Sequence, residues 1–378
     1  MKTIAKRYWK LLTVIFIIGL IVIPIADMHI IERDRNRNEI YGELFWQIGF
    51  NVYKINDNIL KTQYNVSEDH LLASYLNVTY EYPVITLLFF AFITGIFPGI
   101  HGLQHIFINI VLLIIYIANL LLILYIGRKY LEKSWFKLVF SAYAIYGFIM
   151  AVFGGKVEPL TDFFFLLSIY FMQRNNTKMG HFLLGISVQT KVYTAIAFPI
   201  YFIIAPIDSI FFFLSLLITV IPFISTGLSY DTLVRHFLND TGYSPYATNS
   251  LWLGRVFLNP WSITTFIIFI ILEIFTIFKF DKEPNSKFGI KVSFRIRSLQ
   301  DIYMVLFPGT LFLYRWVMPW YFGWFIPLTL ILKKEQSVYY YLRVITIIGF
   351  LYVLGILINI NYYLTNGLLQ EFVGHFQP

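Results

Sequence analysis

The chain of 378 residues contains no cysteine, which excludes disulfides, thiol nucleophiles and cysteine-ligated metal sites. Charged residues are also scarce, because they make up 13% of the chain, against about 25% in an average soluble domain. Hydrophobic residues account for 58%, and the mean hydropathy is +0.68. A soluble fold could not bury this much apolar surface, so the composition predicts an integral membrane protein.

The signatures of soluble enzymes are missing as well. The chain has no Gly-rich phosphate loop, no His-Glu-x-x-His and no Gly-x-Ser-x-Gly elbow. Its seven histidines are scattered, which disfavours a dedicated zinc site. The net charge of +8 comes from basic residues between hydrophobic stretches, so we interpret it as a topology signal and an attraction to lipid headgroups. We therefore expect membrane lipids as partners, no nucleic acid and no cofactor, while a divalent metal stays open.

Hydrophobic stretches close to the length of a membrane span, about 20 residues, recur along the chain. Two are ambiguous, because Pro83–Phe97 is short and Gly180–Ala205 is interrupted by polar residues around Lys191. We expect the first stretch to be retained as a helix, since no small-residue cleavage site follows it. The pattern predicts an all-α polytopic protein with about ten or eleven transmembrane helices in one domain, residues 1–378. The clear candidates are Leu11–Ile31, Leu103–Ile126, Lys137–Phe153, Pro159–Met172, Ser209–Leu228, Trp261–Phe280, Asp301–Leu313, Tyr321–Leu332 and Tyr339–Ile360.

Basic residues predict the orientation, since cytoplasmic loops carry an excess of lysine and arginine. All basic segments fall on one face if Pro83–Phe97 dips into the outer leaflet without crossing and Gly180–Ala205 is a hairpin with Lys191 at its outer tip. This arrangement gives about eleven crossings, with the N-terminus inside and the C-terminus outside. The inside segments are Lys2–Lys10, Arg128–Lys137, Arg174 with Lys178, Lys279–Arg297 and Lys333–Lys334.

Residues 32–98 then form the longest outer segment, which ends with the dipping helix. Apolar residues recur at helical spacing within it, so we expect an amphipathic helix over Glu39–Leu60 that lies on the membrane surface. The residues at this spacing are Ile40, Leu44, Ile48 and Val52.

Polar side chains gather at the predicted outer ends of the helices. Charges at membrane depth are costly, so they are candidates for function. Simpler explanations exist, such as an ion pair between Lys156 and Glu158, a solvated charge cluster around Asp34, or a loop position for His236. Lys191 is the hardest to explain structurally, because it interrupts an apolar stretch. The set comprises Asp27, Asp34, Glu81, Tyr82, Lys156, Glu158, Asp162, Lys191, Arg235, His236, Arg255 and Arg315.

Several segments match, in order, motifs of one membrane enzyme family. Residues 79–83 resemble Tyr-x-Tyr-Pro-Pro, and residues 155–160 resemble Gly-x-x-Asp/Glu-x-Leu. Residues 185–199 resemble Gly-Leu-x-x-x-x-Lys-x-x-Pro…Leu-Pro, residues 249–255 resemble Asn-Gln-Ser-Leu-x-Gly-x-x-x-Arg, and residues 319–327 resemble Pro-x-Tyr-x-x-Trp-x-x-Pro. Together they resemble the multi-spanning glycosyltransferases of the GT-C superfamily, above all the family 87 mannosyltransferases and the catalytic subunit of GPI mannosyltransferase I.

The resemblance implies a GT-C-like helix bundle and an inverting transfer of a hexose, with mannose favoured. The donor would be a polyprenyl- or dolichyl-phosphate sugar, and the acceptor a lipid or glycan on the non-cytoplasmic face. The membrane would be the cell membrane of a prokaryote or the endoplasmic reticulum of a eukaryote. In this superfamily a carboxylate soon after the first helix is the catalytic base. Asp34 is preferred for that role here, and Asp27 competes with it.

The resemblance also implies roles in substrate binding. Cationic side chains would stabilise the charge on the departing lipid phosphate, and aromatic side chains would pack on the sugar or on isoprene units. Glu158 would orient Lys156 or an acceptor hydroxyl, and His236 would donate to phosphate or acceptor. The substrate-binding candidates are Glu81, Tyr82, Lys156, Glu158, Lys191, His236, Arg255, Arg315, Trp320 and Tyr321.

Three alternatives stay open. The first is a transporter or flippase for a lipid-linked or anionic solute, for which Lys191 and Gly154–Gly155 would mark a broken-helix site. The second is a membrane scaffold without catalytic activity. The third is a GT-C enzyme that moves another sugar, or that transfers a glycan onto protein.

Overall fold

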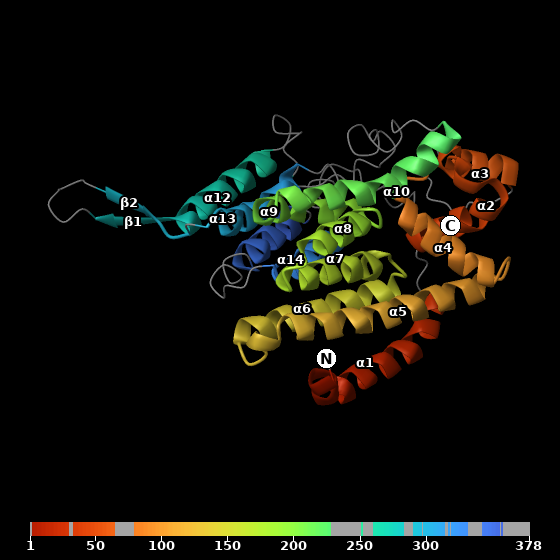
Figure 1. Cartoon of the computed structure of the whole chain (residues 1–378), viewed down its shortest axis with the longest axis horizontal. Helices are drawn as coiled ribbons and strands as arrows, with labels where there is room; N and C mark the ends of the chain where they lie inside the picture. The colour runs from red at the N-terminus through yellow and green to blue at the C-terminus, as the bar shows by residue number, and fades with distance from the viewer. Residues whose placement is uncertain are drawn as a thin grey trace. The chain divides into compact units, whose positions relative to one another are not determined.

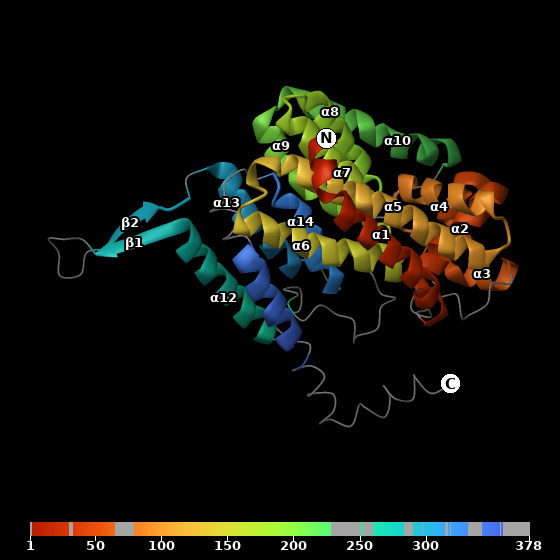
Figure 2. The ribbon, with the colours of Figure 1, turned by 90° about the horizontal axis from the view of Figure 1, so that it is seen from below.

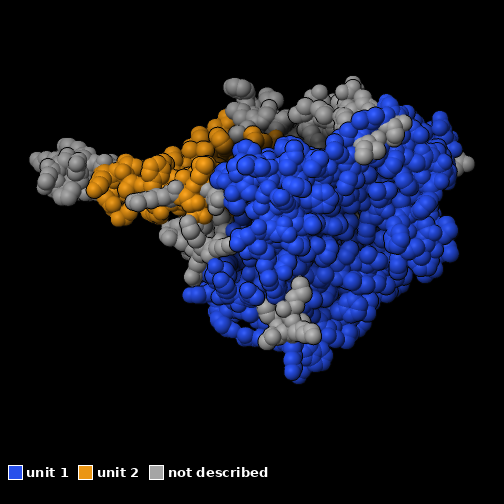
Figure 3. All heavy atoms as spheres, viewed as in Figure 1, with its two compact units in different colours: residues 1–243, 323–331 blue, residues 244–322, 332–378 orange. Residues whose placement is uncertain are grey.

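The computed structural model describes residues 2–29, 33–64, 79–227, 251, 260–282, 290–296, 298–313, 317, 319–331, 342–355 and 357. The chain divides into two compact units (Figure 3). Unit 1 comprises residues 1–243 and 323–331, and unit 2 comprises residues 244–322 and 332–378. We describe each unit by itself.

The named elements in the described part of unit 1 are all helices, and they include short 3-10 and π-helical turns (η). An isolated β-bridge joins Asn56 and Thr79. Figure 1 labels the main helices along the chain. Their bounds are α1 Lys2–His29, α2 Arg33–Ile48, η1 Gly49–Lys54, α3 Asp57–Tyr64, α4 Val84–Ile96, α5 His101–Ile126, η4 Arg128–Tyr130, α6 Ser134–Phe148, η5 Ile149–Phe153, α7 Glu158–Gln173, α8 Thr177–Val188, η6 Val192–Ala197, α9 Phe198–Ile204, η7 Ile207–Ser209, α10 Ile210–Thr226 and α14 Phe325–Leu328.

The core of unit 1 is organised around α5, which packs against α1, α6 and α7. α7 in turn packs on α8, and α8 on α10. Small residues permit the closest approaches, as is common between helices in lipid. A Cβ added at Gly185 would lie 1.7 Å from Oγ of Ser215, so α8 and α10 could not pack this closely with a larger residue there.

Three helices of the described part are long and apolar enough to cross a membrane: residues 6–28, 101–126 and 134–153. Other apolar helices have 10–17 residues, and α4 has 13. At about 1.5 Å per residue, α4 is too short for a hydrocarbon core of about 30 Å. The structure therefore indicates a helical protein that associates with a membrane.

The outer segment differs from its prediction. A single amphipathic helix over Glu39–Leu60 is wrong, because α2 ends at Ile48 and Gly49 has a positive φ of 59° before η1 and α3 follow. The prediction placed the apolar side of this helix on the membrane surface, but in the structure α2 packs on α4. Gly42 allows the two backbones to approach closely. The buried cluster beneath comprises Tyr41, Leu44, Val52, Tyr53, Leu60, Tyr80, Val84 and Leu87.

The predicted interruption at Lys191 coincides with a break in the helix. α8 ends at Val188, and the chain resumes as η6 at Val192. The turn is tied to the start of α4, because the backbone N–H of Ile85 donates to Gln189 O at 3.2 Å and the Thr86 hydroxyl donates to Thr190 O at 2.5 Å.

Unit 2 corrects the all-α prediction. α12 (Pro260–Ile277) stops short of the predicted end at Phe280, and strands β1 (Phe278–Lys282) and β2 (Ile290–Phe294) follow as an antiparallel pair. Figures 1 and 2 show β1 continuing from the end of α12 and β2 running back beside it toward α13. The remaining elements are α13 Leu299–Leu306, η10 Phe307–Phe312, η11 Pro319–Trp324, which crosses the unit boundary, and a helix over residues 342–355.

Candidate functional site

The first turns of α2 bury a run of polar side chains, which is costly unless each is paired. None of the five is more than 6% exposed. This run comprises Arg35, Asn36, Arg37, Asn38 and Glu39.

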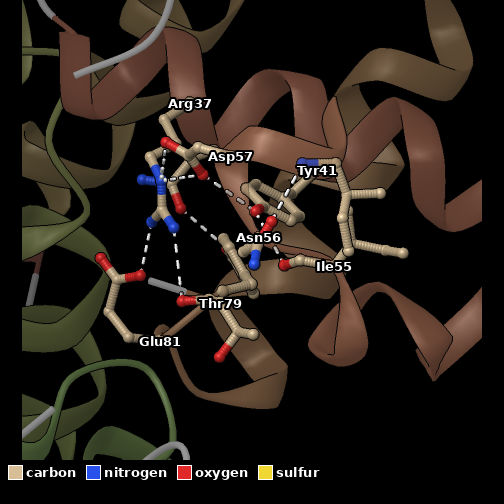
Figure 4. A network of polar contacts seen from close by, with 10 residues as sticks. Arg37, Tyr41, Ile55, Asn56, Asp57, Thr79 and Glu81 are labelled. Atoms are coloured by element: carbon tan, nitrogen blue, oxygen red, sulfur yellow. Dashed lines mark hydrogen bonds and ion pairs between the residues drawn. The ribbon is translucent and has the colours of Figure 1, made fainter. Parts of the chain in front are cut away.

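Arg37 lies at the centre of one network, the Arg37 cluster (Figure 4). Its Nε donates to both carboxylate oxygens of Asp57, at 2.9 and 3.0 Å, and its two terminal nitrogens contact Glu81 and the carbonyl of Thr79. The Tyr41 hydroxyl also donates to Asp57, at 3.0 Å, while the Tyr41 ring lies under the guanidinium at 5.0 Å. The network joins α2, the start of α3 and the strand-like segment before α4.

The charged groups of this network shift one another's pKa values. Burial opposes the charged form of Arg37, but Glu81, Tyr41 and Asp57 outweigh it, and the pKa of Arg37 lies well above its ordinary value. Burial raises the pKa of Asp57, and the adjacent Arg37 only partly offsets it. The arginine therefore stays charged while the carboxyl is harder to ionise than in water.

Arg35 organises a second network, the Arg35 cluster, at the junction of α1, α2 and α5. Its guanidinium lies 2.9 Å from Asp27 and 3.3 Å from Nδ1 of His105. Nε2 of His105 lies 2.7 Å from Glu39, and Nδ1 of His101 lies 2.8 Å from the other oxygen of Glu39. Asp27 thus connects through His105 and Glu39 to the half-exposed ring of His101.

The chain passes Arg35 closely at Gly155, where only glycine fits. A Cβ at Gly155 would lie 2.5 Å from Cδ of Arg35 and 2.6 Å from Oδ1 of Asn109, and its φ of 52° is in the left-handed region. The contact places the start of α7 beside the Arg35 cluster.

A third group, the Lys191 cluster, comprises Tyr82, Glu158, Lys191 and Trp324. Nζ of Lys191 lies 2.6 Å from Oε1 of Glu158, and 5.7 and 5.3 Å from the ring centres of Tyr82 and Trp324. Glu158 is fully buried, while the lysine side chain is 17% exposed. The second oxygen of Glu158 is buried and has no hydrogen-bond partner. The cluster therefore contains a partly exposed ammonium group between two aromatic rings, and one oxygen of Glu158 that accepts no hydrogen bond.

A buried polar layer supports this cluster. Asp162 accepts hydrogen bonds from the hydroxyls of Tyr193, at 2.6 Å, and Tyr143, at 3.0 Å. Nδ2 of Asn119 donates to the Tyr143 hydroxyl at 2.9 Å. Tyr193 stacks on Trp324 with ring centres 4.4 Å apart and planes at 9°. Asp162, singled out in the sequence, thus fixes an aromatic wall of the cluster rather than facing a ligand.

The three clusters are linked along the chain. Glu81 of the Arg37 cluster precedes Tyr82 of the Lys191 cluster, and Gly155 beside Arg35 precedes Glu158 by three residues. Of the predicted set, the structure brings together Tyr82, Glu158 and Lys191, whereas Asp27 lies in the Arg35 cluster and Glu81 in the Arg37 cluster.

The other predicted residues are not all placed. Lys156 is buried on the turn between Gly155 and α7, and Tyr321 is half-buried in η11. Asp34 lies in α2, and Trp320 in η11, but their side chains fall outside the described residues. His236, Arg255 and Arg315 lie outside them entirely.

Sequence reasoning missed the residues that pair with these candidates. Arg35 and Arg37 were not among the candidates and entered only through the alternative of a solvated charge cluster around Asp34, because a charge run gives no sign of burial. His101 and His105 are spaced four residues apart on α5, a signal that could have marked them. Glu39 and Asp57 carried no signal of their own.

Among the described residues, no group of three His, Asp or Glu side chains is placed to hold a metal ion. An open hollow of about 450 Å³ lies at the other end of α2. Its Glu43 is already engaged, since Gln104 donates to it at 2.6 Å and the Gly99 N–H at 3.0 Å. The hollow is lined by Glu43, Trp46, Gln47, Thr94, Gly95, Pro98 and Gly99.

Comparison with protein-family models, with curated proteins and with solved structures finds no match in any of the three. A functional assignment must therefore come from the site itself and from the sequence motifs that converge on it.

Proposed function

We propose that this protein is a multi-pass membrane glycosyltransferase. It would transfer a hexose, with mannose favoured, from a polyprenyl- or dolichyl-phosphate donor to a lipid or glycan acceptor on the non-cytoplasmic face. One observation carries the proposal. Tyr82, Glu158, Lys191 and Trp324 come from four separate segments that resemble GT-C motifs, and all four meet around the lysine.

The membrane arrangement is part of the proposal. Three helices have the length and composition of spans. For about eleven crossings, the shorter apolar helices must cross as well, with breaks such as the one at Lys191 buried inside the bundle, where irregular backbone is tolerated.

The Lys191 cluster suits a lipid-phosphate sugar. Lys191 supplies a point charge for the phosphate, and Tyr82 and Trp324 offer flat apolar faces for the sugar or the first isoprene units. Glu158 holds the lysine through one oxygen, and its second oxygen is buried without a hydrogen-bond partner, so a bound donor would have to open the cluster before a sugar hydroxyl could donate to it. The donor anion would then compete with Glu158 for the ammonium group.

The reaction would be a single displacement. The acceptor oxygen attacks the anomeric carbon, the bond from that carbon to the phosphate oxygen breaks, and a carboxylate takes the acceptor proton. Asp34 is the preferred base and Asp27 its competitor. In the structure, the carboxylate of Asp27 is held by Arg35 at 2.9 Å. Arg255, Arg315 and His236 would complete the phosphate and acceptor sites.

The test is transfer from labelled polyprenyl-phosphate mannose by the full chain reconstituted in liposomes. Asp34→Asn and Asp27→Asn are compared with wild type, and Glu132→Gln, an exposed carboxylate, serves as control. Loss of transfer in only one of the two aspartate variants assigns the base. Absence of transfer by well-folded wild type from every lipid-phosphate sugar tried would remove the proposal.

A second candidate function, a transporter, is favoured by the two helix breaks. The π-helical turn η5 ends at Gly154 before α7 begins, and α8 breaks before Lys191, so both breaks meet at the Lys191–Glu158 pair. Broken helices often form substrate sites in transporters. Because the chain has no cysteine, Val192→Cys can be labelled alone. Labelling from both faces of the membrane favours transport, and labelling from one face favours the transferase.

A further inference from the structure

The β1–β2 hairpin has two chemically different faces. Phe278 pairs with Phe294, and Phe280 pairs with Val292. Residues directly opposite in an antiparallel pair point to the same side, and neighbours along a strand alternate. One face of the hairpin is therefore apolar, and the sequence between these positions forms the other face.

The side chains of the apolar face are exposed, and within the described part of unit 2 nothing covers them. Phe280 is 41% exposed, Val292 53% and Phe294 54%. An isolated two-stranded hairpin is marginal in water, and contiguous exposed apolar side chains mark interaction surfaces. We therefore expect another surface to cover this apolar face of the hairpin.

The opposite face is basic. Lys279 and Lys291 are exposed there, and Asp281 is the acidic residue between them; Arg295, also exposed, directly follows the end of β2. Lys279 contacts Asp281 at 3.0 Å, with both side chains about half exposed. The described side chains of this face therefore carry an excess of positive charge, which complements an anionic surface.

The hairpin is fixed to the end of an apolar helix. Strand β1 follows α12 without a linker, and the backbone N–H of Arg295 donates to Ile277 O at 2.8 Å. Ile277, Ile296 and Val305 form a small buried core at this junction. The hairpin is thus held by more than its own strand pairing.

The apolar face continues the exposed side of α12. Ile267, Ile271, Ile274 and Phe275 are between 41% and 58% exposed along this helix. The ring of Phe275 contacts that of Phe280 with centres 5.5 Å apart. One apolar strip therefore runs from the helix onto the strands, and a helix of this composition is expected to face lipid.

We propose that the hairpin is an anionic-lipid-binding surface. Its apolar face lies in the boundary between headgroups and acyl chains, and its lysines and arginine attract acidic phospholipids in the same leaflet. The proposal does not depend on sugar transfer, because it rests only on the hairpin and α12.

The test uses spin labels on single cysteines in the full chain, which has no native cysteine. Val292→Cys reports the apolar face, and Ser293→Cys, the next residue, reports the basic face as a matched control. The labelled chain is placed in bilayers of phosphatidylcholine with phosphatidylglycerol. Collisions with oxygen, which dissolves in lipid, are compared with collisions with a water-soluble nickel complex.

We expect the Val292 label to collide mainly with oxygen and the Ser293 label mainly with nickel. Removing charge by Lys291→Gln should reduce the preference for phosphatidylglycerol over pure phosphatidylcholine bilayers by about fivefold. A label at Phe275→Cys, expected in lipid in every variant, verifies that the fold is retained.

Two outcomes would overturn the proposal. Equal nickel access at both positions would mean that the hairpin stands in water. Dipolar broadening between Val292 labels of different molecules, with low access to both reagents, would mean that a second copy covers the face.

Discussion

The Arg37 and Lys191 clusters are built from the same groups, a buried cation with carboxylates and aromatic rings, yet they differ in completeness. Arg37 contacts two carboxylates and a carbonyl, and its side chain is 3% exposed. Lys191 contacts one carboxylate and is 17% exposed, and Glu158 keeps an oxygen without a hydrogen-bond partner. The Arg37 network has its charges matched within the fold, whereas the Lys191 network keeps one acceptor unpaired and its cation partly exposed.

Arg37→Met should produce the largest loss of stability. It leaves Asp57 and Glu81 facing each other without their cation, and breaking a buried ion pair costs about 3–5 kcal/mol. Thermal unfolding in detergent measures the effect, with Arg128→Met as an exposed control. An unchanged unfolding temperature would show that the Arg37 cluster is not structural.

Lys191→Met should lower transfer by about 10²–10³-fold, since it removes a cation expected to stabilise developing charge. The substitution also leaves the buried Glu158 without its cation, so part of the loss of transfer would come from lower stability. The double variant Lys191→Met with Glu158→Gln should recover stability without recovering transfer, with Lys129→Met as the exposed control. If the double variant recovered both stability and transfer, the role of the Lys191 cluster would be structural, like that of the Arg37 cluster.

Gly155→Ala should cost about 1–3 kcal/mol, because the added Cβ clashes with Arg35 and the backbone φ is positive. Gly102→Ala, where nothing lies within 4 Å, is the matched control, and it should stabilise α5 by up to about 1 kcal/mol. Equal unfolding temperatures for the two variants would contradict the close contact between Gly155 and Arg35.

The smallest effect is a pH dependence from Asp57. Because burial raises its pKa in the folded state above the unfolded value of about 3.9, the folded state binds the proton more tightly. Stability should therefore fall as pH rises through the folded pKa, and stay level above it. Asp57→Asn should remove this slope in unfolding temperature against pH. Parallel curves for the two proteins would rule out this assignment.

The long apolar helices were predictable because a continuous hydrophobic run in lipid satisfies its backbone hydrogen bonds by forming a helix. The predicted span Leu103–Ile126 lies within α5, and Lys137–Phe153 lies within α6 and η5. The β1–β2 hairpin was missed, since lysines and arginines in residues 279–297 suggested a loop and hid the alternation of Phe278, Phe280, Val292 and Phe294.

The site was only partly predictable for a different reason. Tyr82, Glu158 and Lys191 stood out because polar groups are rare in apolar sequence. Arg35 and Arg37 did not, because a buried guanidinium and a solvated one look alike until the partner from another segment is placed. His105 is such a partner, because it is 70 residues from Arg35 in number yet 3.3 Å from it in space.

The π-helical turn over Ile149–Phe153 has a consequence for the connection that leads to α7. Its wider hydrogen bonding, with the Gly154 N–H donating to Ile149 O at 3.1 Å, accommodates one extra residue in the turn. Non-helical residues 154–157 then separate the turn from α7, and the Lys156 N–H donates back to Met150 O at 3.0 Å. We expect a deletion in this turn to displace that connection, and with it the start of α7 that carries Glu158, while every side chain of the Lys191 cluster stays the same.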